Sequence, residues 1–169
     1  MKTSFVNFED TNSFSTLFLN YINQHPKLGD YHKFTPKIEN YRSYLDQYSS
    51  LDRLRLSEEL QTQHAKLQLS ITQLKNIESL KKSNTFTVTT GHQLNIFGGP
   101  LFFVYKILTA IKTCEELKLK YPKHDFIPIY WMASEDHDFE EISTFNFGGN
   151  DYKWETDQKG AVGQFDTEE

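Results

Sequence analysis

Residues 85–132 read TFTVTTGHQLNIFGGPLFFVYKILTAIKTCEELKLKYPKHDFIPIYWM and contain three successive patterns of regular structure. The β-branched run Thr85–Thr90 predicts a strand. Pro100 opens a helix to about Tyr121 whose apolar stripe is wide enough for a helix covered on more than one side. The apolar run Phe126–Met132 is typical of a strand buried on both faces. Strand, helix and strand in this order predict a βαβ unit with a right-handed crossover and a parallel sheet.

The residues after the second strand predict a β-hairpin. Residues 142–147 and 152–155 have strand character, and the turn sequence Gly148-Gly149-Asn150-Asp151 separates them. Residues 85–169 therefore hold one βαβ unit and a hairpin, whereas a doubly wound sheet needs several such units. We expect the chain to be the N-terminal piece of a longer protein.

Residues 1–84 are polar, and their apolar residues have helical spacing, so we expect a separate N-terminal helical region. A helix over residues 14–22 is expected to be capped by Thr11 or Ser13 and to end before His25-Pro26. A second helix is expected to begin at Thr35-Pro36.

The longest helix of this region is expected from Ser57 to Lys82, with acidic residues in its first turn and lysines in its last. Leu60, Leu67 and Leu74 are seven residues apart, which suits a short coiled-coil seam. An amphipathic helix packed on its own domain is the more common explanation of so few repeats.

Composition is that of a soluble globular protein, with 37% apolar, 24% charged and 15% aromatic residues. A net charge of −5 gives no electrostatic basis for binding nucleic acid or an anionic membrane surface. We see neither a secretory signal nor an apolar run near the roughly twenty residues that span a bilayer. The single cysteine, Cys114, cannot form an internal disulfide, which favours the cytoplasm, and its place in the apolar stripe predicts a packing role.

The loop of residues 91–100, GHQLNIFGGP, joins the first strand to the helix N-terminus, where α/β proteins bind ligands. Its glycines allow close backbone approach, and free helix amides favour an anion. It is neither a Walker A loop nor GxGxxG, and Gly98-Gly99 could serve turn geometry alone. The polar residues His92, Gln93 and Asn95 favour a binding loop, although His92 by itself is more typical of a structural residue.

Six ionisable residues lie within residues 135–141, directly after the second strand and hence at the same sheet edge as the loop. Charge in such a place is costly unless it is paired. If the segment is extended, Asp136 and Asp138 face one way and His137 faces the other. Carboxylates suit Mg²⁺, and an Asp–His pair suits acid–base chemistry. A solvated acidic turn is the alternative interpretation.

Two segments resemble a known family, the bacillithiol biosynthesis cysteine-adding enzymes (BshC). TTGHQLNIFGGPLFFVYK (89–106) is similar to the family segment TGQQ-x-G-x-x-x-GPL-x-x-x-x-K, and IPIYWMASEDHDFEEI (127–142) resembles P-V-F-W-V-A-[SG]-EDHDF-x-E-[IV]. FLNYINQHPKLGDYHKFTP (18–36) is similar less specifically. His92 stands where the family often has Gln and Asn95 where it often has Gly, so Gln93 is the better candidate for a functional side chain.

The resemblance implies an α/β fold in which this chain is the first part of a Rossmann-like, nucleotide-binding core, with a helical coiled-coil domain in the whole protein. The implied enzyme is a cytoplasmic ligase that adds L-cysteine to glucosaminyl-malate, with the carboxylate activated as an adenylate by ATP with Mg²⁺. Nucleic acid and membrane are not expected partners, and a homodimer of the full-length protein is left open. A non-catalytic nucleotide-binding scaffold and a metal-dependent hydrolase using the acidic cluster are the alternatives.

The resemblance also implies roles for individual residues. The catalytic set is His137, which would stabilise charge or move a proton, with Asp136 and Asp138, which would orient it or hold Mg²⁺. The residues expected to bind nucleotide or substrate lie in the two loops and at their flanks: Thr90, Gly91, Gln93, Phe97, Gly98, Gly99, Pro100, Trp131, Ser134 and Glu135.

Overall fold

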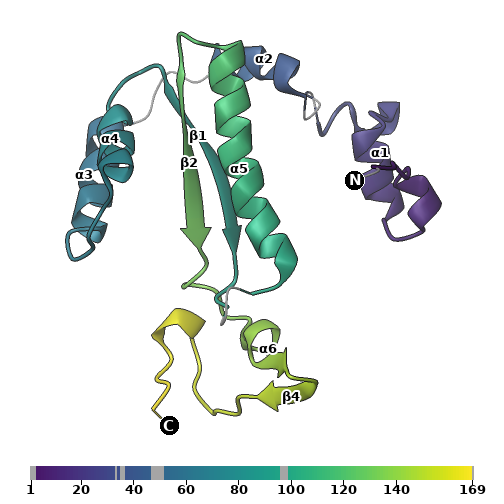
Figure 1. The fold of residues 1–169 in the computed structure, drawn as a ribbon, viewed down its shortest axis with the longest axis vertical. Helices are drawn as coiled ribbons and strands as arrows, with labels where there is room; N and C mark the ends of the chain where they lie inside the picture. Colours follow the sequence, from purple (N-terminus) through teal and green to yellow (C-terminus); the bar gives the residue numbers. More distant parts are fainter. Residues whose placement is uncertain (1–2, 33, 35–36, 47–51, 96–98, 169) are drawn as a thin grey trace. The chain divides into compact units, whose positions relative to one another are not determined.

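The computed structural model describes residues 3–32, 34, 37–46, 52–95 and 99–168. The chain forms two compact units, Met1–Ser50 and Leu51–Glu169, each with its own internal packing (Figure 1). Composition suggests a division at residue 84, but residues 52–84 belong by their contacts to the second unit. None of the helices in the described ranges combines the length and the apolar character that a membrane span requires.

The N-terminal unit contains short helices and 3₁₀ turns. These are η1 (Glu9–Thr11), α1 (Thr16–Ile22), η2 (Pro26–Leu28), η3 (Ile38–Asn40) and α2 (Tyr41–Leu45). α1 confirms the first predicted helix, but its cap is Ser15, whose hydroxyl accepts a hydrogen bond from the Phe18 amide at 3.2 Å. The predicted caps Thr11 and Ser13 are therefore wrong. Residues 35 and 36, where the second helix is expected to begin, lie outside the described residues.

The second unit begins with two helices where one long helix is predicted, namely α3 (Arg53–Gln63) and α4 (Ile71–Ser79). The break has a local cause, a capping box at the start of α4. The Ser70 hydroxyl accepts from the Gln73 amide at 3.2 Å, and the Gln73 side chain accepts from the Ser70 amide at 2.9 Å. Leu67 falls in the connection with 63% of its surface exposed, so the leucine heptad does not form one continuous seam.

A parallel pair of strands forms the centre of the second unit. β1 (Thr85–His92) pairs with β2 (Asp125–Met132) in a register that runs from Thr85 opposite Asp125 to His92 opposite Met132. α5 (Leu101–Lys120) connects the strands and packs along them (Figure 1). The predicted βαβ unit and its parallel pairing are confirmed. Pro100 is extended, with ψ 156°, and precedes the first helical residue instead of occupying it.

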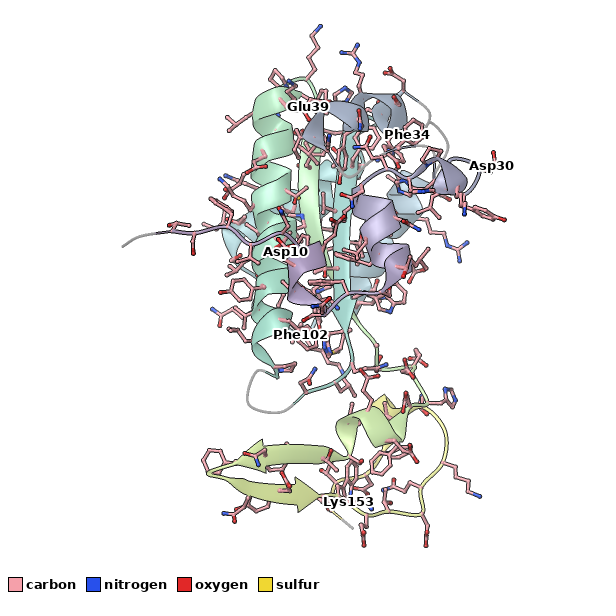
Figure 2. All side chains as sticks on the ribbon, turned by 90° about the vertical axis from the view of Figure 1, so that its right-hand side faces the viewer. Asp10, Asp30, Phe34, Glu39, Phe102 and Lys153 are labelled. Atoms are coloured by element: carbon pink, nitrogen blue, oxygen red, sulfur yellow. The ribbon has the colours of Figure 1, made fainter. Side chains whose placement is uncertain are left out.

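The side of α5 that faces the sheet buries Ala110, Cys114 and Leu117. Burial raises the pKa of the Cys114 thiol to about 11, which keeps it protonated and confirms its packing role. The opposite side of α5 exposes apolar side chains, among them Leu108 at 54%, so the expected cover on more than one side is not present among the described residues. Figure 2 shows Phe102 at the end of α5 that lies beside the carboxyl ends of the strands.

β2 is buried at Ile127 (4% exposed) but not along its whole length. At its carboxyl end Trp131 and Met132 are 66% and 59% exposed. The prediction of a strand buried on both faces is therefore wrong for this end, because these consecutive residues point to opposite faces and both are exposed. An exposed ring thus stands beside the polar loops that follow the strands.

The chain after β2 forms a one-turn helix and a hairpin. The elements are α6 (Phe139–Ile142), β3 (Thr144–Phe147), β4 (Asn150–Lys153) and the turn η4 (Val162–Gln164). β3 and β4 are antiparallel, which confirms the predicted hairpin. Its bounds differ, because Asn150 and Asp151, expected in the turn, belong to β4, and Ile142, expected in the first strand, belongs to α6. Gly148 and Gly149 have φ values of 61° and 80°, as a tight two-residue hairpin turn requires.

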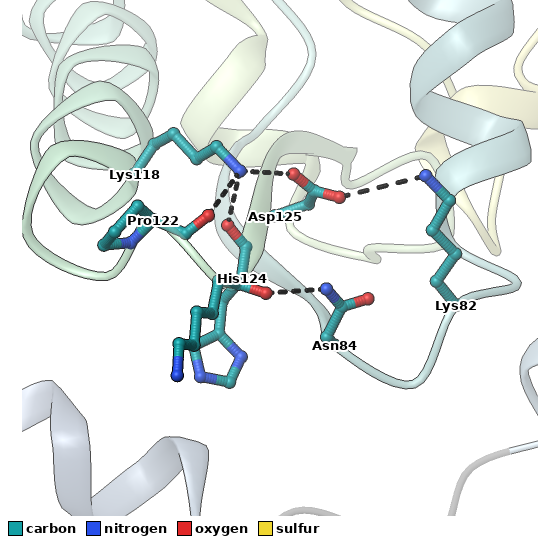
Figure 3. A network of polar contacts seen from close by, with 7 residues as sticks. Lys82, Asn84, Lys118, Pro122, His124 and Asp125 are labelled. Carbon is teal, nitrogen blue, oxygen red and sulfur yellow. Dashed lines mark hydrogen bonds and ion pairs between the residues drawn. The ribbon is translucent and has the colours of Figure 1, made fainter.

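A polar network fixes the opposite end of the sheet, where α5 ends and β2 begins (Figure 3). The Lys118 ammonium donates to the carbonyl oxygens of Pro122 (3.1 Å) and His124 (2.9 Å) and to the Asp125 carboxylate (2.8 Å). Lys82 lies 4.0 Å from the other Asp125 oxygen. The Lys118 hydrogen bond, with the nearby positive charges, lowers the pKa of Asp125.

We expect Asp125→Asn to destabilise the protein by about 0.5–1 kcal/mol at pH 7, because a partly exposed ion pair contributes that much. Since the folded-state pKa of Asp125 is lowered, its contribution is present above the unfolded pKa of about 3.8 and is lost as the pH falls through the folded value. Denaturation in urea at pH 7 and at about pH 2.5 measures this, and the two proteins should converge in acid. The exposed Asp157→Asn is the control, and equal stability at pH 7 would contradict the assignment.

Candidate functional site

The loops that follow β1 and β2 are joined directly at the carboxyl edge of the sheet. The Gln93 side-chain amide donates to an oxygen of Asp136 at 2.5 Å, across 43 positions of sequence. Both strands end at the same level, with His92 opposite Met132, so the residues after them emerge side by side. The expectation that the two loops share one edge is met by this pair.

Asp136 is held at both of its carboxylate oxygens. One accepts from Gln93, and the other accepts from the Asp138 amide at 2.9 Å. The Gln93 hydrogen bond, helped by the backbone amides of Asp138 and His137 and by the charge of His137, lowers the pKa of Asp136. Asp136 is therefore a fixed negative charge at neutral pH.

The acidic segment turns instead of remaining extended. The Asp138 carboxylate accepts from the Glu141 amide at 3.3 Å and caps α6, which begins at Phe139. The condition under which Asp136 and Asp138 would share one face, an extended segment, is not met, because helix capping engages the Asp138 side chain. His137 lies between the two carboxylates in the chain and is exposed.

His92 is part of the packing at the start of α5. Its ring centroid lies 4.9 Å from that of Phe102 and 5.8 Å from that of Phe103. Asn95 donates to the carbonyl oxygen of Gln93 at 2.5 Å, and its amide nitrogen lies 3.0 Å from His92 Nδ1. These contacts fit the structural role that the sequence favours for His92, and they fold the loop back on itself.

Gly91 and Gly99 are required for two different reasons, lack of space for a side chain and a left-handed backbone conformation. Gly91 lies within β1, not in the loop, and a Cβ there would stand 2.6 Å from the Trp131 carbonyl oxygen. Gly99 has φ +66°, a conformation that favours glycine, and it packs on Asn95. Phe97 and Gly98 lie outside the described residues, and so does any contact of Gly98 with the acidic loop.

The other predicted binding residues lie along the same edge. Thr90 pairs with Tyr130 and Gly91 pairs with Trp131, directly before the last residue pair of β1 and β2. Ser134 is half-buried in the turn after β2, and Glu135 is exposed beside it. Pro100 stands at the start of α5. These predicted binding residues therefore all lie near the carboxyl ends of β1 and β2.

Residues 162 and 163 contact the acidic loop, which is the segment of residues 133–138 between β2 and α6. The sequence analysis does not include these two residues among the site candidates. The Val162 amide donates to the Asp136 carbonyl oxygen at 2.8 Å, and the Gly163 amide donates to the Ser134 carbonyl oxygen at 3.0 Å. No local pattern could reveal this, because the contact joins segments about thirty residues apart through backbone atoms only.

The part of the chain that the structure describes provides no preformed Mg²⁺ site. Within those residues no group of three His, Cys, Asp or Glu side chains could hold a metal ion. Asp136 and Asp138 are engaged by Gln93 and by backbone amides, so they do not form a protein cage for Mg²⁺. The Gln93 side-chain oxygen is buried and accepts no hydrogen bond from the described part of the chain.

A parallel βαβ unit with polar loops at its carboxyl edge defines a Rossmann-like α/β domain. Residues 1–169 match the family profile described as Bacillithiol biosynthesis BshC, N-terminal Rossmann-like domain. The chain belongs to the BshC family.

Relatives named "Putative cysteine ligase BshC" share this sequence over nearly its whole length. The one from Flavobacterium psychrophilum is 42% identical over 172 residues, covering 99% of this chain and 32% of the relative. The one from Christiangramia forsetii is 45% identical over 177 residues, covering 99% and 33%. The chain therefore spans about a third of the length of these relatives.

We expect Gln93→Ala to raise the pKa of Asp136 toward the ordinary aspartate value of 3.8, because the largest cause of its lowering is the Gln93 hydrogen bond. Carbon-detected NMR titration of the Asp136 carboxyl group measures the change. The exposed Gln61→Ala in α3 is the matched control and should leave this pKa where it is. An unchanged Asp136 titration in Gln93→Ala would show that the bond does not form in solution.

Proposed function

We propose that this chain is part of a cysteine ligase of bacillithiol biosynthesis, which adds L-cysteine to glucosaminyl-malate with ATP as the activating substrate. One observation carries the proposal: in a chain that matches the BshC family throughout, Gln93 and Asp136 hold the EDHDF loop at the ligand-binding edge of a parallel sheet. Because the chain spans about a third of its relatives, the proposed activity belongs to the full-length protein.

Amide formation from a carboxylate and an amine requires the carboxylate to be activated. In the proposed reaction the cysteine carboxylate attacks the α-phosphorus of ATP, which releases pyrophosphate and forms an adenylate. The amine of glucosaminyl-malate then attacks the carbonyl carbon of this adenylate, and AMP leaves. The attacking amine must also lose a proton. Mg²⁺ enters the proposal only as the ion that accompanies the nucleotide phosphates, and no step depends on it.

His137 is our candidate for the group that takes up this proton. Imidazole can accept and release a proton near neutral pH, and His137 is exposed at the sheet edge. Asp136 fixes the turn that presents it, through Gln93 on one side and the Asp138 amide on the other. Asp138 contributes through the cap of α6, which sets the path of the chain after His137.

The proposed nucleotide site lies on the side of β1, where the chain enters α5. The first amides of this twenty-residue helix favour a phosphate, and Gly99 leaves the backbone beside them accessible. Thr90 and Gln93 flank this position on β1 and the loop after it. The exposed Trp131 ring offers an apolar surface against which a ligand can pack.

In the full-length enzyme we expect His137→Ala to lower kcat by about 10²- to 10⁴-fold, the usual contribution of a general acid–base group. ATP affinity should be unchanged, because the proposed phosphate site lies on the other loop. Single-turnover formation of the amide product gives the rate, and titration of ATP gives the affinity. His64→Ala, at the C-terminal end of α3, is the matched control. A wild-type rate in His137→Ala would remove its catalytic role.

Omitting each substrate in turn distinguishes the proposed ligase from other functions. A ligase of this kind consumes ATP only when cysteine and glucosaminyl-malate are both present. A nucleotide-binding scaffold would bind ATP and leave it intact under every condition. A metal-dependent hydrolase would show turnover that follows added metal and needs no cysteine. Either of the last two results would overturn the proposal.

A further inference from the structure

The turn η4 is tied to the loop that carries His137, although 25 residues separate Val162 from His137 in sequence. The Val162 amide donates to the Asp136 carbonyl oxygen at 2.8 Å, and the Gly163 amide donates to the Ser134 carbonyl oxygen at 3.0 Å. The Val162 side chain is only 4% exposed, so the turn is anchored in the packed part of the unit. Backbone atoms on both sides of residue 135 are therefore fixed from outside the loop.

Gly163 makes this approach close because it has no side chain. A Cβ at this position would stand 2.6 Å from the Cβ, 2.7 Å from the carbonyl oxygen and 2.9 Å from the Cα of Ser134. Two of these three atoms belong to the backbone, so a change of side-chain rotamer at Ser134 cannot relieve the clash. The φ angle of Gly163 does not lie in the left-handed range, so the requirement for glycine here is one of space alone.

An aromatic cluster holds the other end of the same turn. Phe165 lies 5.5 Å from Phe139, the first residue of α6, and 6.1 Å from Trp154, measured between ring centroids. Phe139 and Trp154 are 5.2 Å apart in an edge-to-face arrangement. His137 therefore lies between two fixed points, the backbone bonds of η4 before it and the aromatic cluster after it.

We propose that Gly163 is a positioning residue for the His137 loop, which it holds in register with Gln93 by letting η4 pack directly on Ser134. This inference rests on the proposed function where it predicts a lower kcat. The predicted loss of contact between η4 and the loop does not depend on that function. A methyl group at residue 163 must displace either η4 or the loop by a substantial part of an ångström. Misplacement of about 1 Å can lower a rate about 10²-fold even when binding energy is retained.

The test compares Gly163→Ala with Gly160→Ala in the full-length enzyme. Gly160 has φ +112° and no atom within 4 Å of a built Cβ, so its substitution strains the backbone without touching the loop. We expect Gly163→Ala to lower kcat about 10- to 100-fold with little change in the KM for ATP. Gly160→Ala should lower the melting temperature and keep its kcat. Equal loss of kcat in both variants would show a general effect of stability and overturn the proposal.

Val162→Pro provides a second variant should Gly163→Ala fail to fold. Ala161 has φ −68° and ψ 123°, which a residue before proline favours, and the first position of a helical turn tolerates proline. The substitution removes the amide that bonds to Asp136 and puts the proline Cδ where the amide hydrogen was, so the Asp136 carbonyl oxygen must move away from η4. We expect the same fall in kcat, and a kcat equal to that of the wild type would overturn the proposal.

Hydrogen exchange separates failure of this inference from failure of the proposed function. In the folded Gly163→Ala protein, exchange of the Val162 amide should be about tenfold faster or more, because its bond to the loop is lost. This readout needs no substrate, so it holds even if the wild-type enzyme forms no amide from cysteine. Wild-type protection of this amide in a folded Gly163→Ala protein would overturn the positioning role.

Discussion

The parallel pairing of β1 with β2 is the constraint on which the rest of the second unit depends. In a parallel pair both carboxyl ends lie at the same edge, and here the register brings His92 and Met132 level. The next residues of each strand then emerge within hydrogen-bonding reach, so Gln93 can bond to Asp136. An antiparallel pair would place the two polar loops at opposite ends. The candidate site follows from strand direction before any side chain contributes to it.

Long, uniform patterns were predictable from the sequence, and short competing signals were not. β1, α5 and β2 follow from runs of β-branched and apolar residues that packing reinforces. The break between α3 and α4 arises from one capping box at Ser70, which local hydrogen bonds favour over continuation of the apolar spacing. The same kind of local hydrogen bond, with Asp138 as the cap, begins α6 at Phe139.

The candidate site was predictable to the extent that it depends on topology. The parallel direction of the two predicted strands places residues 93 and 136 at one edge of the sheet, and the structure adds the hydrogen bond between them. The role of Gly91 was not predictable, because its need for close approach comes from the neighbouring strand at Trp131. Gly163 was invisible for the same reason, since its neighbour is the backbone of Ser134. Steric requirements between distant segments leave no periodic trace in a sequence.

Asp136 and His137, neighbours in the EDHDF run (135–139), are suited to different tasks. Both oxygens of Asp136 accept hydrogen bonds and its pKa is lowered, so it is poorly suited to donate a proton and well suited to hold a backbone path. His137 is exposed, and in the proposed function it is the side chain that takes up a proton. A carboxylate that stays charged keeps the same hydrogen bonds throughout a reaction. A group that gains and loses a proton changes its hydrogen bonds each time. In the proposed reaction this division lets Asp136 hold the loop while His137 takes up the proton of the attacking amine.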